Sequence, residues 1–134
     1  FALTRIAVVQ QNLGEYRVAQ RFFHDAIDKT QETGDWVSET IALSEAGLLE
    51  EKIGNKEKAI EYYQRAIDIF YEYKVLHGTP ILFYSMANLY KEDEKFDNAI
   101  RITKETIELA DSLNNQVFVV DGLVNLGRIY HSMG

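Results

Sequence analysis

The chain has 134 residues, about the length of one ordinary domain, which leaves no room for a catalytic domain joined to a regulatory one. Hydrophobic residues make up 46% and charged residues 26% of the chain, so the composition excludes a disordered tail and a collagen-like fibre. Cysteine is absent, which excludes a disulfide framework, a thiolate zinc site and a thiol nucleophile. The net charge of −7 disfavours nucleic acid as a partner, because a phosphate backbone is bound by clustered cations.

The sequence carries no sign of a membrane span or of a secretion signal. No stretch approaches the roughly 20 uninterrupted apolar residues that a membrane helix needs, and the N-terminus lacks the three-part pattern of a signal peptide. We therefore expect a cytoplasmic protein. The first residues, from Phe1 to Ala7, already read as the interior of a helix without a capping residue. This predicts that the chain is a fragment of a longer protein.

Apolar residues recur with helical spacing along the whole chain, and the single proline favours long helices over a turn-rich sandwich. Gly14 and Gly54 stand where a helix ends, since a left-handed backbone costs least without a side chain. Further breaks follow at Gly34, at Asn114, and at Gly78-Thr79-Pro80, where Thr79 is predicted to be the N-cap and Pro80 the first helical residue. Seven helices are predicted, at about 1–12, 16–33, 36–53, 56–76, 80–92, 96–113 and 116–132.

The sequence also repeats itself at a step of 40 residues. Gly14 and Gly54 are one step apart, and the next steps reach Glu94 and Gly134. Other residues of one size recur in the same register: Ala19, Ala59 and Ala99; Ala7, Gly47, Ala87 and Gly127; Leu3, Leu43, Phe83 and Leu123; Ile27, Ile67 and Ile107. A place restricted to Ala or Gly marks a close approach of two helix axes. The repeats are therefore predicted to be packed pairs of helices.

The residues of one period resemble a known repeat. Leu43, Ala46, Gly47, Gly54, Ala59, Tyr63 and Ala66 resemble the signature of the tetratricopeptide repeat, and the same places in the first period hold Leu3, Ile6, Ala7, Gly14, Ala19, Phe23 and Ala26. The third period departs most, with Glu94, Thr103 and Thr106. The family's usual period is 34, and the longer period here is expected to lengthen the helices. The long-period variety resembles the repeats of peptide-binding bacterial regulators and of adaptor proteins.

The resemblance implies an all-α fold, a right-handed superhelical solenoid of antiparallel helix pairs. About three and a half repeats are expected in a single solenoid over residues 1–134, at about 1–34, 35–78, 79–114 and, in part, 115–134. By the geometry of the family, the first helix of each pair lines a concave groove. The positions implied to face it are Val8, Gln11, Ile41, Ser44, Leu48, Glu51, Ile81, Tyr84, Asn88, Lys91, Asp121, Asn125 and Arg128.

Two asparagines give the later part of this surface its expected chemistry. The amides of Asn88 and Asn125 both donate and accept, so they can grip successive amides of an extended peptide, or else they are ordinary solvated residues. Arg128 would add a contact to a carboxylate. This partly resembles the carboxylate clamp of the family, except that Tyr84 stands where the clamp has lysine.

Several patterns that imitate catalytic or metal sites are better explained by helices. Gly122 to Gly127 has the glycine spacing of a phosphate loop without its lysine, and His24 with Asp28 offers only two local metal ligands. The acids of Lys91 to Lys95 fit an exposed turn. We expect no enzyme activity, cofactor or metal. In the aromatic run Tyr62, Tyr63, Phe70, Tyr71 and Tyr73, two or three rings are predicted to be core and the others an outer patch.

The sequence therefore predicts a protein–protein interaction module that binds a peptide or helix of a partner protein in its groove, with no nucleic acid and no membrane partner. Two alternatives stay open: the sensor part of a peptide-responsive regulator, and a structural self-assembly unit. The last helix would present Leu123, Leu126, Ile129 and Tyr130 without a second helix over them, so self-association through one or both ends is expected. A hydrolase or accessory enzyme would need convergent carboxylates or histidines, which the spacing does not offer.

Overall fold

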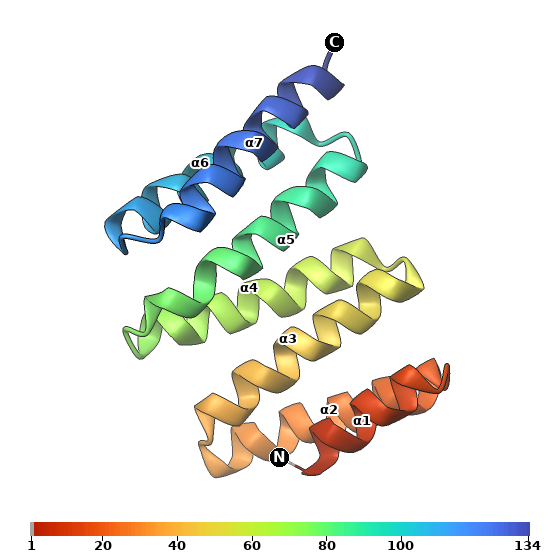
Figure 1. Cartoon of the computed structure of the whole chain (residues 1–134). Helices are drawn as coiled ribbons and strands as arrows, with labels where there is room; N and C mark the ends of the chain where they lie inside the picture. The colour runs from red at the N-terminus through yellow and green to blue at the C-terminus, as the bar shows by residue number, and fades with distance from the viewer. Residues whose placement is uncertain (1) are drawn as a thin grey trace. The chain divides into compact units, whose positions relative to one another are not determined.

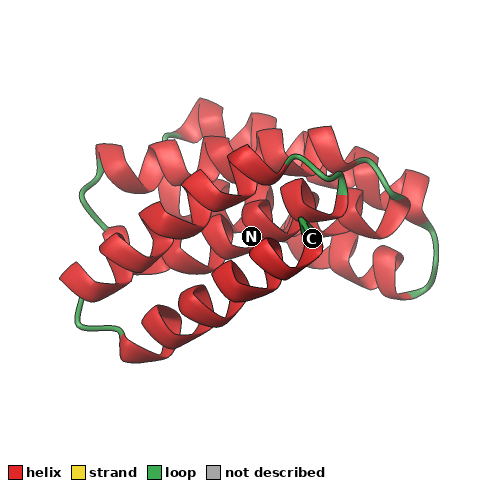
Figure 2. Ribbon diagram, turned by 90° about the horizontal axis from the view of Figure 1, so that it is seen from above, coloured by secondary structure: helices red, strands yellow, loops and turns green. Residues whose placement is uncertain are grey.

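A computed structural model describes residues 2–134, and within that range it contains α-helices and no strand, as Figures 1 and 2 show. The seven α-helices are α1 (Ala2–Asn12), α2 (Tyr16–Thr33), α3 (Trp36–Ile53), α4 (Lys56–Glu72), α5 (Thr79–Glu92), α6 (Phe96–Ser112) and α7 (Gln116–Ser132), with a short 3-10 helix η1 (Leu76–Gly78) before α5. The predicted all-α repeat fold is confirmed. Phe1, where the first predicted helix begins, lies outside the described residues.

The chain forms two compact units, Phe1–Tyr73 and Lys74–Gly134. In the first unit α1 packs on α2 and α3 packs on α4, while α2 and α3 also pack on each other. In the second unit α5 packs on α6 and α6 packs on α7. Consecutive helices are thus neighbours in each unit, which is the arrangement expected of a helical repeat protein.

The repeat in the sequence is also visible in the backbone. The residues at 14, 54, 94 and 134 all have positive φ, with values of 82°, 96°, 58° and 97°. A second set one helix away, at 34, 74 and 114, has φ of 72°, 57° and 56°. Glycine meets this requirement without strain, whereas Lys74, Glu94 and Asn114 adopt the left-handed region with a side chain. The helices therefore end at matching places even where the glycine has been replaced.

The small residues of the repeat lie at helix contacts. Ala19, Ala59 and Ala99, each one repeat from the next, are all fully buried. Gly47 of α3 has no room for a side chain, because a Cβ there would lie 2.5 Å from Cε1 of Tyr63 in α4. The ring of Tyr63 lies against the α3 backbone, and its hydroxyl donates a hydrogen bond of 2.6 Å to Glu51 Oε1. The prediction that these places mark close helix approaches is confirmed at Gly47 and at the three alanines. It is wrong at Gly127, which is exposed and where a Cβ would meet no described atom within 4 Å.

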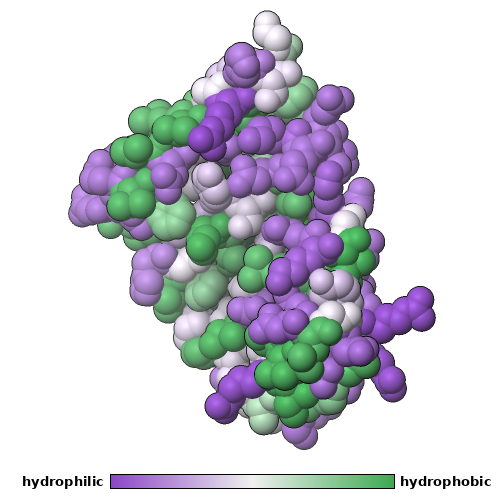
Figure 3. Space-filling model, turned by 45° about the vertical axis from the view of Figure 1, so that its right-hand side comes forward, coloured by the Kyte–Doolittle hydropathy of each residue, from purple (hydrophilic) through white to green (hydrophobic). Residues whose placement is uncertain are grey.

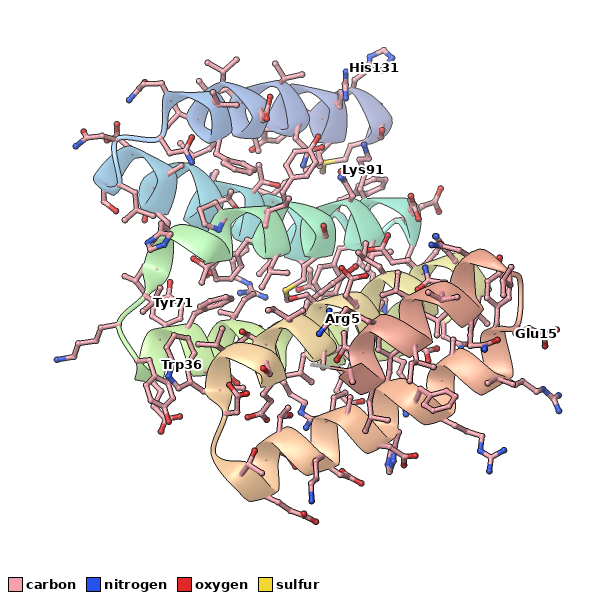
Figure 4. All side chains as sticks on the ribbon, turned by 60° about the horizontal axis from the view of Figure 1, so that its bottom comes forward. Arg5, Glu15, Trp36, Tyr71, Lys91 and His131 are labelled. Atoms are coloured by element: carbon pink, nitrogen blue, oxygen red, sulfur yellow. The ribbon has the colours of Figure 1, made fainter. Side chains whose placement is uncertain are left out.

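The aromatic run of α4 divides as the sequence predicts. Tyr62 and Tyr63 are buried, Phe70 is half-buried, and Tyr71 and Tyr73 are exposed. Tyr73 stacks on Trp36, with ring centroids 4.5 Å apart and ring planes 11° from parallel. In Figure 4, Trp36 and Tyr71 lie at one end of the first unit and Glu15 at the other. The stack therefore fastens the beginning of α3 to the end of α4.

Two predicted helix boundaries are wrong. The helix expected over 56–76 ends at Glu72, and the chain then turns through Lys74, whose φ is 57°, into η1. Thr79 is the first residue of α5 and not its N-cap, which is Gly78. The Thr79 hydroxyl donates a hydrogen bond of 2.7 Å to the carbonyl oxygen of Leu76, so it stabilises η1 instead of capping α5.

None of the helices in residues 2–134 is both long enough and apolar enough to cross a membrane.

Candidate functional site

One side of α3 combines exposure with apolar character. Val37, Ile41 and Leu48 are 50%, 52% and 42% exposed, and their spacing of four and seven residues places them on one face of the helix. Figure 3 shows apolar side chains reaching the molecular surface among hydrophilic ones. The rest of α3 is largely buried among its neighbours, including Leu43 and Leu49. We call Val37, Ile41 and Leu48 the α3 apolar stripe.

Polar groups flank the α3 apolar stripe, and two of them already have partners within the fold. The Ser44 hydroxyl donates a hydrogen bond of 2.8 Å to the carbonyl oxygen of Thr40. Glu51 Oε1 accepts the hydrogen bond from Tyr63, and burial of the Tyr63 ring, followed by that bond to Glu51, raises the pKa of the hydroxyl. Tyr63 therefore stays protonated as the donor. Both polar residues leave capacity for a ligand, since a hydroxyl and a carboxylate can each accept further hydrogen bonds.

The α1 residues differ from the expectation for a groove. Val8 is half-buried, and Gln11 is buried with only 6% of its surface exposed. Gln11 shares a side of α1 with Thr4 and Ala7, which are buried too. The expectation that Gln11 faces a ligand is therefore wrong, because its position lies on the packed side of the helix.

In the second unit, α5 presents the residues that its sequence suggested. Ile81 is exposed, while Tyr84, Asn88 and Lys91 are half-buried. Their spacing of three, four and three residues places all four on one side of α5. Figure 4 labels Lys91 near the end of this helix. The surface thus begins with an aliphatic residue and ends with an amide and an ammonium group.

In α7, Asp121 and Arg128 are exposed, but Asn125 is only 1% exposed. Its Nδ2 lies 3.4 Å from the hydroxyl oxygen of Thr103 in α6 and donates to it. Asn125 shares its side of α7 with Gly122 and Ile129, both buried, and a Cβ at Gly122 would lie 2.5 Å from Ile107 of α6. Asn88 and Asn125 therefore do not form an exposed pair, because the second asparagine packs against α6.

Sequence reasoning missed Val37, although a signal for it was present. Val37 precedes Ile41 by four residues, so the helical period that selected Ile41 also selects Val37. The residue lies inside the helix predicted over 36–53, but it was not named among the groove positions.

The patterns that imitate catalytic or metal sites lie in ordinary helices and turns. Gly122 and Gly127 are both inside α7, so they form no phosphate loop. His24 Nδ1 lies 3.4 Å from Asp28 Oδ2, and both side chains are more than half exposed. Among the described residues, no group of three or more His, Cys, Asp or Glu side chains is placed to hold a metal ion.

Solved structures share this fold. BtubC (BKLC) from P. vanneervenii is 25% identical with a TM-score of 0.82, over 98% of this chain and 54% of that one. Aspartyl phosphate phosphatase F from Bacillus subtilis is 18% identical with a TM-score of 0.83, over 98% and 36% of the two chains. A signal transduction ATPase with numerous domains (STAND) and a tetratricopeptide repeat sensor, from Pyrococcus horikoshii, is 21% identical with a TM-score of 0.72, over 86% and 18%.

The chain thus spans about half of the length of BtubC and less of the other two proteins. A search of curated proteins finds no match to it. The model of the family described as tetratricopeptide repeat matches residues 1–72, which is more than half of the sequence and includes the α3 apolar stripe. The chain belongs to the tetratricopeptide repeat family.

Proposed function

We propose that the chain, a protein-interaction repeat module, binds a segment of a partner protein along the exposed sides of its first helices. The α3 apolar stripe is the observation that carries this proposal. Three large apolar residues on the solvent side of a largely buried helix leave about half of their surface in water. Covering them with apolar side chains of a partner gains about 25 cal/mol per Å² removed from water. The stripe therefore supplies the affinity for an apolar anchor in the partner.

The second unit contributes polar recognition in this proposal. Ile81 and Tyr84 of α5 offer apolar surface, and the Asn88 amide can both donate to and accept from a peptide backbone. Lys91 of α5 and Arg128 of α7 are cations that can pair with a carboxylate of the ligand, and Asp121 can pair with a cation. On the second unit, an extended segment with an acidic side chain is the ligand that fits these residues best.

Peptide selection tests the proposal. Random peptides displayed on phage are selected on the immobilised chain, and the enriched sequences are then assayed against the Ile41→Ser/Leu48→Ser variant. We expect enriched peptides to carry large apolar residues and to lose about tenfold or more in affinity for the variant, because each side chain contributes apolar contact area. Val117→Ser in α7 is the control, since Val117 is 69% exposed and belongs to none of the proposed surfaces. Peptides that bind all three proteins equally would overturn the proposal.

A sensor role is a second form of this proposal. It is suggested by the STAND protein, whose tetratricopeptide repeats are described as a sensor. In that case the same surface would receive a peptide signal for an attached effector. Binding of a selected peptide would then change the conformation of the chain, which a pair of fluorophores placed at Glu15 and His131, both exposed, would report. An unchanged transfer efficiency on peptide binding would contradict the sensor role.

We also propose self-association through α7, as a separate function of a different surface. Leu123 and Tyr130 are 54% and 49% exposed, whereas Ile129, which the sequence placed on the same face, is fully buried and Leu126 is half-buried. Val120 adds to the exposed apolar surface. We expect the chain to form dimers that Leu123→Asp/Tyr130→Asp dissociates. A monomeric profile of the unmodified chain in ultracentrifugation over a wide concentration range would contradict this.

A further inference from the structure

The first unit contains a hollow that belongs to neither of these surfaces. Its walls come from α2, from the last turn of α3 and from α4, and its volume is about 670 Å³. That volume lies within the range of about 300–1,000 Å³ that is typical of ligand pockets. The only α3 residue in its wall is Glu50, which is two residues from Leu48 and so roughly 200° around the helix from it. The hollow and the α3 apolar stripe therefore open on different sides of α3.

Cations gather around this hollow in a chain whose net charge is −7. Arg17 and Arg21 stand one turn apart on α2, and Lys58 faces the hollow from α4. Among the described residues, no carboxylate lies within ion-pair distance of any of the three. Lys58 instead lies 5.7 Å from the centre of the Tyr62 ring. The charge of the three side chains is thus available to an anion.

The buried acid in the wall already has partners. Glu50 is only 3% exposed, and its two oxygens accept hydrogen bonds from Gln20 Nε2 at 2.9 Å and from Asn55 Nδ2 at 2.8 Å. Asp25 lies 3.9 Å from His24 Nδ1. The two amide contacts hold the Glu50 carboxylate, whereas the Asp25 side chain is 67% exposed. A buried carboxylate held by two amides also keeps α2, α3 and α4 in register, so the cations are presented from a defined scaffold.

Tyr62 adds a neutral donor to the wall. Burial, and then the nearby charge of Glu50, raises the pKa of its hydroxyl, so the group stays protonated at neutral pH. Lys58 and Arg65 lie on its ring, at 5.7 Å and 6.0 Å from the ring centre. A protonated hydroxyl in the same wall as the cations of Arg17, Arg21 and Lys58 is a combination that binds oxyanions.

We propose that this hollow binds an acidic segment of a partner polypeptide. Arg17 and Arg21 would each receive a carboxylate, and Lys58 and the Tyr62 hydroxyl would receive another from the opposite wall. The distribution of the cations favours a peptide over a single free ion, because they come from two helices and those on α2 stand one helical turn apart. The proposal does not depend on the α3 apolar stripe, since the two surfaces share no residue.

A fluorescein-labelled oligoglutamate peptide is the probe, and its fluorescence anisotropy with the full chain gives the affinity. We expect Arg17→Gln/Arg21→Gln to weaken binding about tenfold, because two charge pairs are lost. The control variant is Arg101→Gln/Lys104→Gln, which removes the same charge from exposed positions of α6 in the second unit. The affinity of the control should stay within about twofold of the unmodified chain. Circular dichroism confirms that both variants keep their helices.

Three results would overturn the proposal. One is that the unmodified chain does not bind the peptide. Another is that both variants lose the same affinity, which would indicate general charge attraction. Inorganic phosphate that displaces the peptide at an equal concentration would show a site for free oxyanions and not for a polypeptide. Ile41→Ser/Leu48→Ser should leave oligoglutamate binding unchanged, so failure of the α3 apolar stripe and failure of this hollow give different results.

Discussion

Helices α3 and α7 stand two repeat steps apart and carry nearly the same residues on one face. Leu43, Ala46 and Gly47 of α3 correspond to Leu123, Leu126 and Gly127 of α7. In α3 this face is closed, because α4 packs on it: Leu43 is fully buried, and Gly47 leaves no space for a Cβ beside Tyr63. The sequence of the face is thus suited to receive a second helix.

In α7 the same face is open. Leu123 is 54% exposed, and a Cβ at Gly127 would meet no atom within 4 Å among the described residues. Gly122 and Ile129, on the opposite side, are buried as their α3 counterparts are, because α6 packs on them as α2 packs on α3. The comparison teaches that the burial of a helix face depends on the neighbouring helix. The sequence of the face is suited to packing whether or not a neighbour covers it.

The largest expected difference between the two helices comes from shortening the matched leucines. Leu43→Ala should lower the free energy of unfolding by about 2–5 kcal/mol, because it leaves a cavity between α3 and α4. Leu123→Ala should lower it by less than about 1 kcal/mol, since half of that side chain is already in water. Urea unfolding followed by circular dichroism measures both. The change in helix propensity is the same in each variant, so equal losses would show that α7 is covered in solution.

The matched glycines should respond with opposite signs. Gly47→Ala forces the new methyl group against the buried Tyr63 ring, and overpacking of this kind costs about 1–3 kcal/mol. Gly127→Ala meets nothing and should stabilise the chain by up to about 1 kcal/mol, because alanine is the better helix former. The midpoints of thermal unfolding, measured side by side, check the signs. A loss of stability at Gly127 would mean that another helix occupies the face.

The repeat step explains how much of the fold could be predicted from the sequence. Each pair is held by a few places where only one size of residue fits, such as Ala19, Ala59 and Ala99, so a single sequence reveals the packing by repeating it. Helix ends were harder to predict. Lys74 adopts the left-handed conformation without being glycine, and Thr79 bonds backwards to η1, so neither gives the usual local signal.

Much less of the candidate site could be predicted, because the exposure of a polar residue depends on its neighbours. Asn125 is buried although the resemblance placed it in the groove, and the reason lies in a departure from the repeat in α6. Thr103 stands where Phe23 and Tyr63 stand in the other pairs, and its hydroxyl both donates to the carbonyl oxygen of Ala99 and accepts from Asn125. The polar residue Thr103 at a place that is aromatic in the other pairs was the signal that a polar partner lies against it.

A smaller effect is expected for the Tyr63 hydroxyl, which joins α4 to α3 through its hydrogen bond to Glu51. Tyr63→Phe keeps the ring against Gly47 and removes only the hydrogen bond to Glu51, so it should cost about 1–2 kcal/mol. Tyr130→Phe in α7 is the control, since the Tyr130 hydroxyl has no hydrogen bond among the described residues, and its stability should not change. Chemical denaturation at neutral pH separates the two. A cost at Tyr130 equal to that at Tyr63 would assign the effect to hydration and not to the bond.

The smallest expected effect concerns the first turns of the two helices. Asp35 Oδ1 accepts a hydrogen bond of 3.1 Å from the Ser38 amide, and Asn115, two repeat steps later, accepts one of 3.3 Å from the Phe118 amide. The two caps have the same geometry and differ in charge. The hydrogen bonds from Ser38 hold the pKa of Asp35 below its usual value. The caps should therefore differ in their response to acid.

A carboxyl whose pKa is lower in the folded chain than in the unfolded chain stabilises the fold above the unfolded pKa, about 3.9 for aspartate. That stabilisation is lost as the pH falls through the lower, folded value. Asp35→Asn replaces the α3 cap with the uncharged cap of α7, so the variant should be less stable than the unmodified chain at neutral pH and should lose less stability on acidification below about pH 4. Urea midpoints measured from neutral pH down to about pH 2 check this convergence. Parallel curves for the two proteins would show that the charge of Asp35 contributes nothing and that α3 and α7 are capped alike.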